Sequence, residues 1–82
     1  MTDPLPTGLI ADAVRATVEG EPDVVAAWQA GTPKTWGHLA GRAVGTARRL
    51  SGRPLTDGER RQVWAVLWDA LQRLPRMPGG PP

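Results

Sequence analysis

The sequence predicts an all-α protein, a small domain of four helices, and three observations support this fold class. Apolar residues recur with helical periodicity through residues 32–50. The segment Thr-Asp-Gly-Glu at residues 56–59 has the spacing of a capping box, which is typical of a helix N-terminus. No segment alternates apolar and polar residues with the period of a strand. We therefore expect helices only, with the last two forming a C-terminal antiparallel hairpin and the first two packed across it.

Composition divides the chain into three parts. Residues 1–7 contain two prolines and are expected to form an irregular lead-in. Residues 8–74 carry the periodic apolar pattern and are expected to form a single helical domain. Residues 75–82 are rich in proline and glycine, which predicts a disordered tail. A chain of 82 residues builds a core that is only just sufficient, so self-association would be a natural supplement.

The first two helices are short and are separated by a glycine. One helix is predicted over residues 8–19, with the hydroxyl of Thr7 as its cap. The second is predicted over residues 23–30, because Pro22 suits the first turn of a helix. Gly31 is expected to end it, since glycine readily adopts the left-handed conformation that follows a helix.

The third helix, over residues 32–50, has the clearest pattern in the chain. Thr32 followed by Pro33 is expected to begin it, and Gly52 is expected to end it. Its apolar residues fall on one face, so all of them are predicted to lie in the core. They are Trp36, Leu39, Ala40, Ala43, Val44, Ala47 and Leu50.

A row of three glycines lies along one edge of that apolar face. Gly37, Gly41 and Gly45 each cost about 1 kcal/mol of helix propensity relative to alanine, which suggests that something is gained there. The favoured explanation is intramolecular, with a bulky side chain such as a tryptophan packed against the exposed backbone. The other explanation is close contact between the helices of two copies of the chain.

The fourth helix is expected to begin at the capping box of Thr56 and Glu59 and to end before Pro75. Trp64 and Trp68 widen its apolar arc to about 200°, against about 100° for an ordinary surface helix. One neighbouring helix cannot cover so wide an arc, which favours a partner surface. The predicted core face of this helix consists of Val63, Val66, Leu67, Ala70, Leu71 and Leu74.

Charge is distributed unevenly along the chain. Residues 1–31 hold five acids and one base, whereas residues 32–82 hold nine bases and three acids. This asymmetry has three interpretations: attraction between the two halves, a surface that faces nucleic acid, or the arginine bias of a GC-rich coding sequence. The nucleic-acid interpretation depends on an arginine cluster expected around the loop between the last two helices. Its members are Arg42, Arg48, Arg49, Arg53, Arg60 and Arg61.

Residues suited to catalysis are few. The chain contains one histidine and no cysteine or tyrosine, and its acids are scattered, so we expect no enzyme activity, no cofactor and no metal site. His38 is expected to be solvated, and Asp57 and Glu59 are expected to stabilise a helix start. No apolar run reaches the length of a membrane span and the N-terminal segment does not resemble a signal peptide, so no membrane association is expected and a cytoplasmic location is predicted.

These observations together predict a small non-catalytic interaction or assembly module. Its main form is expected to be a homodimer or other homo-oligomer, or a complex with a protein partner. The predicted contact face consists of Gly37, Gly41, Gly45, Trp64 and Trp68. The alternative is a nucleic-acid-binding protein that uses the six arginines named above.

Overall fold

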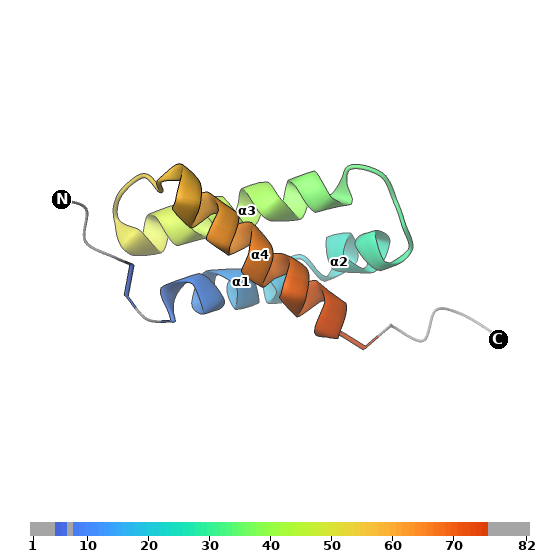
Figure 1. Ribbon diagram of the computed structural model, residues 1–82. Helices are drawn as coiled ribbons and strands as arrows, with labels where there is room; N and C mark the ends of the chain where they lie inside the picture. Colours follow the sequence, from blue (N-terminus) through green and yellow to red (C-terminus); the bar gives the residue numbers. More distant parts are fainter. Residues whose placement is uncertain (1–4, 7, 76–82) are drawn as a thin grey trace.

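The computed structural model describes residues 5–6 and 8–75, and this part of the chain is all-α (Figure 1). Its four helices are α1 (Leu9–Gly20), α2 (Pro22–Gln29), α3 (Thr35–Ser51) and α4 (Asp57–Arg73). No strand occurs within the described ranges. The predicted fold class is therefore confirmed.

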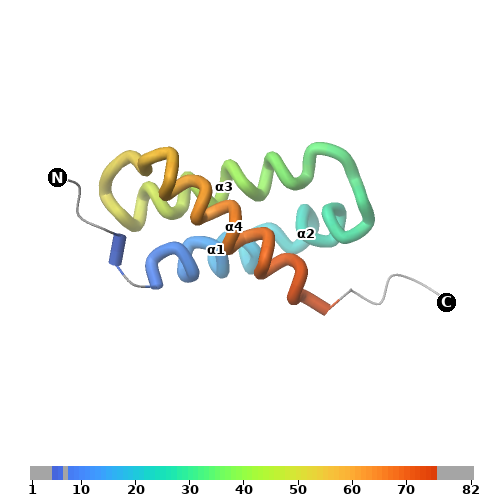
Figure 2. The backbone as a smooth tube through the Cα atoms, in the orientation of Figure 1, coloured from blue at the N-terminus to red at the C-terminus, as the bar shows by residue number. Residues whose placement is uncertain are grey.

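The helices form two crossing layers. Figure 2 shows α1 and α2 following one another along one side, while α3 runs back beside them and α4 crosses obliquely. Helix α1 makes its most extensive contact with α3, and α4 contacts both of these helices. After the short loop from α3, α4 runs in the opposite general direction (Figure 2). Helix α3 thus packs mainly on α1.

The core draws on all four helices and on the loop before α4. Its largest fully buried side chains are Leu39, Val63, Leu67 and Leu71. Leu55 of the loop is also buried, as its apolar character after Pro54 suggests. Burial of a leucine or valine side chain stabilises a fold by about 1.5–3 kcal/mol. These side chains therefore hold α4 against the other helices.

The chemistry of the helix ends is mostly as predicted. The amide N–H of Glu59 donates to Thr56 Oγ1 at 3.2 Å, and the amide N–H of Thr56 donates to Glu59 Oε1 at 2.8 Å. This reciprocal pair is the capping box of α4. Gly52 has a φ of 74° and ends α3, where a side chain would strain the backbone.

The start of α3 differs from the prediction. The helix begins at Thr35, because the amide of Thr32 donates to Ala27 O at 2.9 Å and so completes the end of α2. Lys34 therefore becomes the N-cap residue, with a φ of 70° and no side-chain cap. Thr35 Oγ1 donates to Thr32 O at 2.8 Å, which closes the turn. The N-cap position of α3 is thus occupied by a lysine, whose side chain cannot accept a hydrogen bond from the helix amides.

The start of α1 also differs slightly from the prediction. Gly8, with a φ of 88°, is its N-cap, and the helix begins at Leu9. The predicted role of Thr7 lies outside the described residues. So do residues 1–4 of the predicted lead-in and residues 76–82 of the predicted tail.

Two residues predicted to lie in the core are exposed. Leu50 is 54% exposed in the last turn of α3, where the neighbouring helices no longer cover it. Val66 is 37% exposed, because it lies about 100° around α4 from the buried stripe of Val63, Leu67 and Leu71. Trp36 and Val44 lie at the edge of the core and are partly buried.

Candidate functional site

The glycine row of α3 is open. A Cβ atom built on Gly37, Gly41 or Gly45 would meet no atom of the described chain within 4 Å, apart from those of its own helix turn. The favoured prediction, that a tryptophan of the same chain packs closely against these glycines, is therefore wrong. In the described part of the monomer, no close packing compensates for the helix propensity that is lost at these three glycines.

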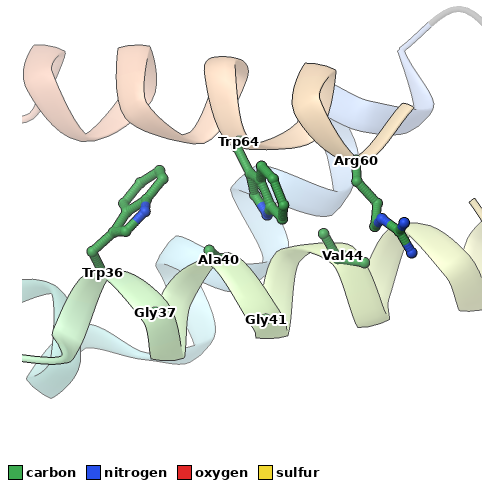
Figure 3. A pocket seen from close by; sticks show the side chains of 7 residues that line it. All are labelled: Trp36, Gly37, Ala40, Gly41, Val44, Arg60 and Trp64. Carbon is green, nitrogen blue, oxygen red and sulfur yellow. The ribbon is translucent and has the colours of Figure 1, made fainter. Parts of the chain in front are cut away.

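An apolar groove lies beside this row, between α3 and α4 (Figure 3). Its volume is about 420 Å³, and we refer to it as the α3–α4 groove. Figure 3 shows Trp36 and Trp64 projecting into it from opposite helices, with Ala40 between them. Arg60 lies past Val44 at the end nearer the loop. The lining residues are Trp36, Gly37, Ala40, Gly41, Val44, Arg60 and Trp64.

Two of the four tryptophans present much of their surface on this side of α4. Trp64 is 39% exposed and Trp68 is 50% exposed. They lie one helical turn apart, so their exposed surfaces are adjacent along α4. Contiguous exposed apolar side chains, unlike single scattered ones, are typical of an interaction surface.

Trp68 is held in place despite its exposure. Its ring packs edge to face on Trp28 at 5.7 Å between centroids, and on Trp36 at 5.4 Å. Each such contact contributes about 0.5–1.5 kcal/mol beyond its buried area. The three rings connect α2, α3 and α4, and they fix the end of the α3–α4 groove that is remote from the loop.

The structure thus brings together four of the five predicted contact residues. Gly37, Gly41 and Trp64 line the groove, and Trp68 extends its wall through Trp36. Gly45 lies one turn beyond Gly41 on the same row. Sequence reasoning missed Trp36, Ala40, Val44 and Arg60 as lining residues. The available signal was the angular position of Val44, which lies at the edge of the apolar face of α3 next to Gly37 and Gly41.

The predicted arginine cluster is only partly free of ion pairs. Arg42 Nε lies 3.0 Å from Glu21 Oε1, and Arg60 pairs with Asp57. Arg53 contacts both carboxylate oxygens of Glu59, at 2.8 and 2.7 Å. For Arg48, Arg49 and Arg61, the described part of the chain offers no ion pair. Arg48 and Arg49 border a second hollow of about 270 Å³ with Gly52, Arg53 and Pro54.

Within the part of the chain that the structure describes, the carboxylate of Glu21 connects the acidic and basic halves. Glu21, at the junction of α1 and α2, forms an ion pair with Arg42, and its Oε1 lies 3.5 Å from Nε2 of His38. Asp12 instead pairs with Arg15 in its own helix, at 2.7 Å. Among residues 8–75, attraction between the halves therefore occurs at one point, on the side of α3 away from the groove.

The carboxylate of Glu59 has a strongly altered acidity. Arg53 donates two hydrogen bonds to it, and the Thr56 amide donates a third, so its pKa is lowered from 4.5 to about 2. Both donors favour the charged carboxylate. Glu59 thus ties the loop to the first turn of α4 while it is ionised.

The described residues hold no group of three or more histidine or acidic side chains placed to bind a metal ion. None of the helices in that part of the chain combines the length and apolar character needed to cross a bilayer. The predicted cytoplasmic location stays a prediction. Comparisons of the chain with known protein families, curated proteins and solved structures found no match.

Proposed function

We propose that this protein is a non-catalytic helical assembly module that self-associates through the α3–α4 groove. One observation carries the proposal: an open glycine row and two exposed tryptophans lie side by side on one face. A surface that holds both a hollow and a protruding ring can be complementary to itself. Such a surface suits a two-fold contact, in which the same patch meets on both copies.

The energetics of the monomer support the same proposal. Three interior glycines cost about 3 kcal/mol of helix propensity relative to alanine, out of a total stability of about 5–15 kcal/mol. Contact with another helix offers a compensating gain, because glycine lets the partner side chain approach the backbone. Burial of the exposed parts of Trp64 and Trp68 adds to that gain, since aromatic residues dominate interface energetics.

The first test is the oligomeric state of the full chain at micromolar concentration, measured by sedimentation equilibrium. We expect a reversible monomer–dimer equilibrium. A strict monomer over this range would contradict the proposal.

The second test is Gly41→Leu, which places a bulky side chain in the middle of the open row. We expect it to weaken self-association by blocking close approach, while the monomer stays folded because the space beside Gly41 is free. Ala16→Leu is the matched control, since it adds a leucine to an exposed position of α1. If both variants assemble like the natural chain, the groove is not the contact surface.

Nucleic-acid binding is a second candidate with weaker support. Arg48, Arg49 and Arg61 make no ion pair with a described residue, so they could contact phosphates around the loop. Such binding would weaken steeply as salt rises, and replacement of Arg49 and Arg61 by glutamine would reduce that dependence. A single-stranded and a double-stranded oligonucleotide at low salt provide the test, and no complex with either would exclude this candidate.

A further inference from the structure

We infer that the second copy lies face to face on the α3–α4 groove about a two-fold axis that runs along the groove (the parallel axis), so that Arg48 pairs with the partner's Asp57. Helix α3 of each copy then packs on α4 of the other. This inference rests on the proposed function and specifies the partner, its orientation and two further contact residues.

The register of α3 and α4 within one chain is the starting point. Figure 3 shows the two helices side by side and Trp64 beside Ala40 and Gly41. One turn away, Trp68 contacts Trp36, and one turn toward the loop, Arg60 lines the groove with Val44. Each step toward the C-terminus of α3 therefore matches a step toward the N-terminus of α4.

This register extends to two charged residues near the loop. Arg48 lies seven residues after Gly41, and Asp57 lies seven residues before Trp64. Each interval is about 10 Å along a helix axis. Arg48 and Asp57 therefore lie at about the same height along the hairpin.

The parallel axis keeps these heights and exchanges the two helices. Gly37 then faces the partner's Trp68, and Gly41 faces the partner's Trp64. Each protruding ring meets exposed backbone, which permits the close helix approach that large side chains would prevent. Arg48 faces the partner's Asp57 at the loop end, and symmetry repeats this ion pair.

The charges distinguish this arrangement from the other simple two-fold arrangement. An axis perpendicular to the helices would stack α3 on the partner's α3 around Gly41. Lys34 would then face the partner's Arg48, because the two residues lie equally far from Gly41. Like charges at both ends would oppose that contact. The parallel axis instead juxtaposes opposite charges.

Both members of the inferred pair are available. Arg48 makes no ion pair with any described residue. The side chain of Asp57 is 77% exposed and contacts Arg60 through Oδ1. Its second carboxylate oxygen can accept a bond from another chain.

The test is a charge exchange. Arg48→Glu and Asp57→Arg each place like charges at two symmetric contacts, so each variant alone should dimerise about tenfold more weakly than the natural chain. An equimolar mixture of the two variants restores both opposite-charge contacts, and so does the double variant as a homodimer. We expect sedimentation to show recovery in both cases.

Asp69→Arg serves as the matched control, because Asp69 lies on a different face of α4 and pairs with Arg73. Circular dichroism checks that each variant is helical. If a charge reversal unfolds the chain, Arg48→Gln and Asp57→Asn provide a milder pair, for which each single change should weaken dimerisation.

The outcomes separate the inference from the proposed function. If the natural chain dimerises but neither the mixture nor the double variant recovers, the inferred orientation is wrong while self-association stands. If the natural chain is a strict monomer, both fail. Recovery in the mixture supports both, since the perpendicular axis does not place these two residues opposite each other.

Discussion

The two sides of α3 use small residues in different ways. On the side that packs on α1, Ala43 and Ala47 are completely buried. On the side of the α3–α4 groove, Gly37 and Gly41 lie against open space. Small residues thus allow close packing where α1 lies against α3. On the groove side, where no helix of the described chain lies against them, they leave open space. A small residue in a helix indicates a contact only after its neighbour is known.

The largest expected effect comes from adding volume on the packed side. Ala43→Leu should reduce the free energy of unfolding by about 3 kcal/mol, because the added side chain has no room at a fully buried position. Urea denaturation measures this loss. Gly41→Leu adds a leucine on the opposite side and should leave monomer stability undiminished. Equal losses in the two variants would remove the distinction between the two sides.

The next expected effect is an increase in the stability of the monomer. Gly41→Ala should raise the free energy of unfolding of the monomer by about 1 kcal/mol, since alanine is the better helix former and its Cβ meets open space. The same change should weaken self-association, because the methyl group separates the two copies. Denaturation at low protein concentration and sedimentation at high concentration measure the two quantities. A rise in both would contradict a contact at the glycine row.

The matching control is a variant that stabilises α3 without changing the groove. Lys34→Gly should raise stability by up to about 1 kcal/mol, because glycine adopts the positive φ of Lys34 without strain. Lys34 does not line the groove, so dimerisation should stay the same. Thermal unfolding and sedimentation of the same sample provide the measurement. A loss of stability would show that the side chain of Lys34 has a role at this turn.

The smallest expected effect is the pH dependence of the start of α4. The folded-state pKa of Glu59 is lowered from 4.5 to about 2, so its contribution is fully present above pH 4.5 and is lost as the pH falls toward 2. Glu59→Gln should therefore be less stable than the natural chain at neutral pH. The difference should disappear near pH 2. A difference that does not change with pH would exclude the Arg53–Glu59 ion pair as its source.

Features set by neighbouring residues were predictable from the sequence. The capping box of Thr56 and Glu59 and the terminal glycines Gly31 and Gly52 lie where the sequence places them, because their chemistry acts within a few residues. The start of α3 was not predictable in the same way. Thr32 can either cap the start of α3 or close the end of α2. The structure shows the second, because the amide of Thr32 donates to Ala27 O.

Features that depend on distant residues were predicted only in part. Helical periodicity gives the angle of a residue around its own helix, but not the neighbour it faces. Leu50 and Val66 are therefore predicted to be core residues, but the structure shows that they are exposed. The same limit applies to Arg42, whose partner Glu21 lies in another part of the chain. The glycine row was correctly located, but its openness depends on where α4 crosses.

The edge-to-face contacts of Trp68 with Trp28 and Trp36 have a spectroscopic consequence. Indole rings that are held in fixed, asymmetric contact, here at interplanar angles of 86° and 84°, give a circular dichroism signal in the near ultraviolet that is lost when tertiary packing is lost. Because the rings belong to α2, α3 and α4, the signal depends on the docking of these helices. It therefore reports tertiary packing separately from helix content, without any label added to the chain.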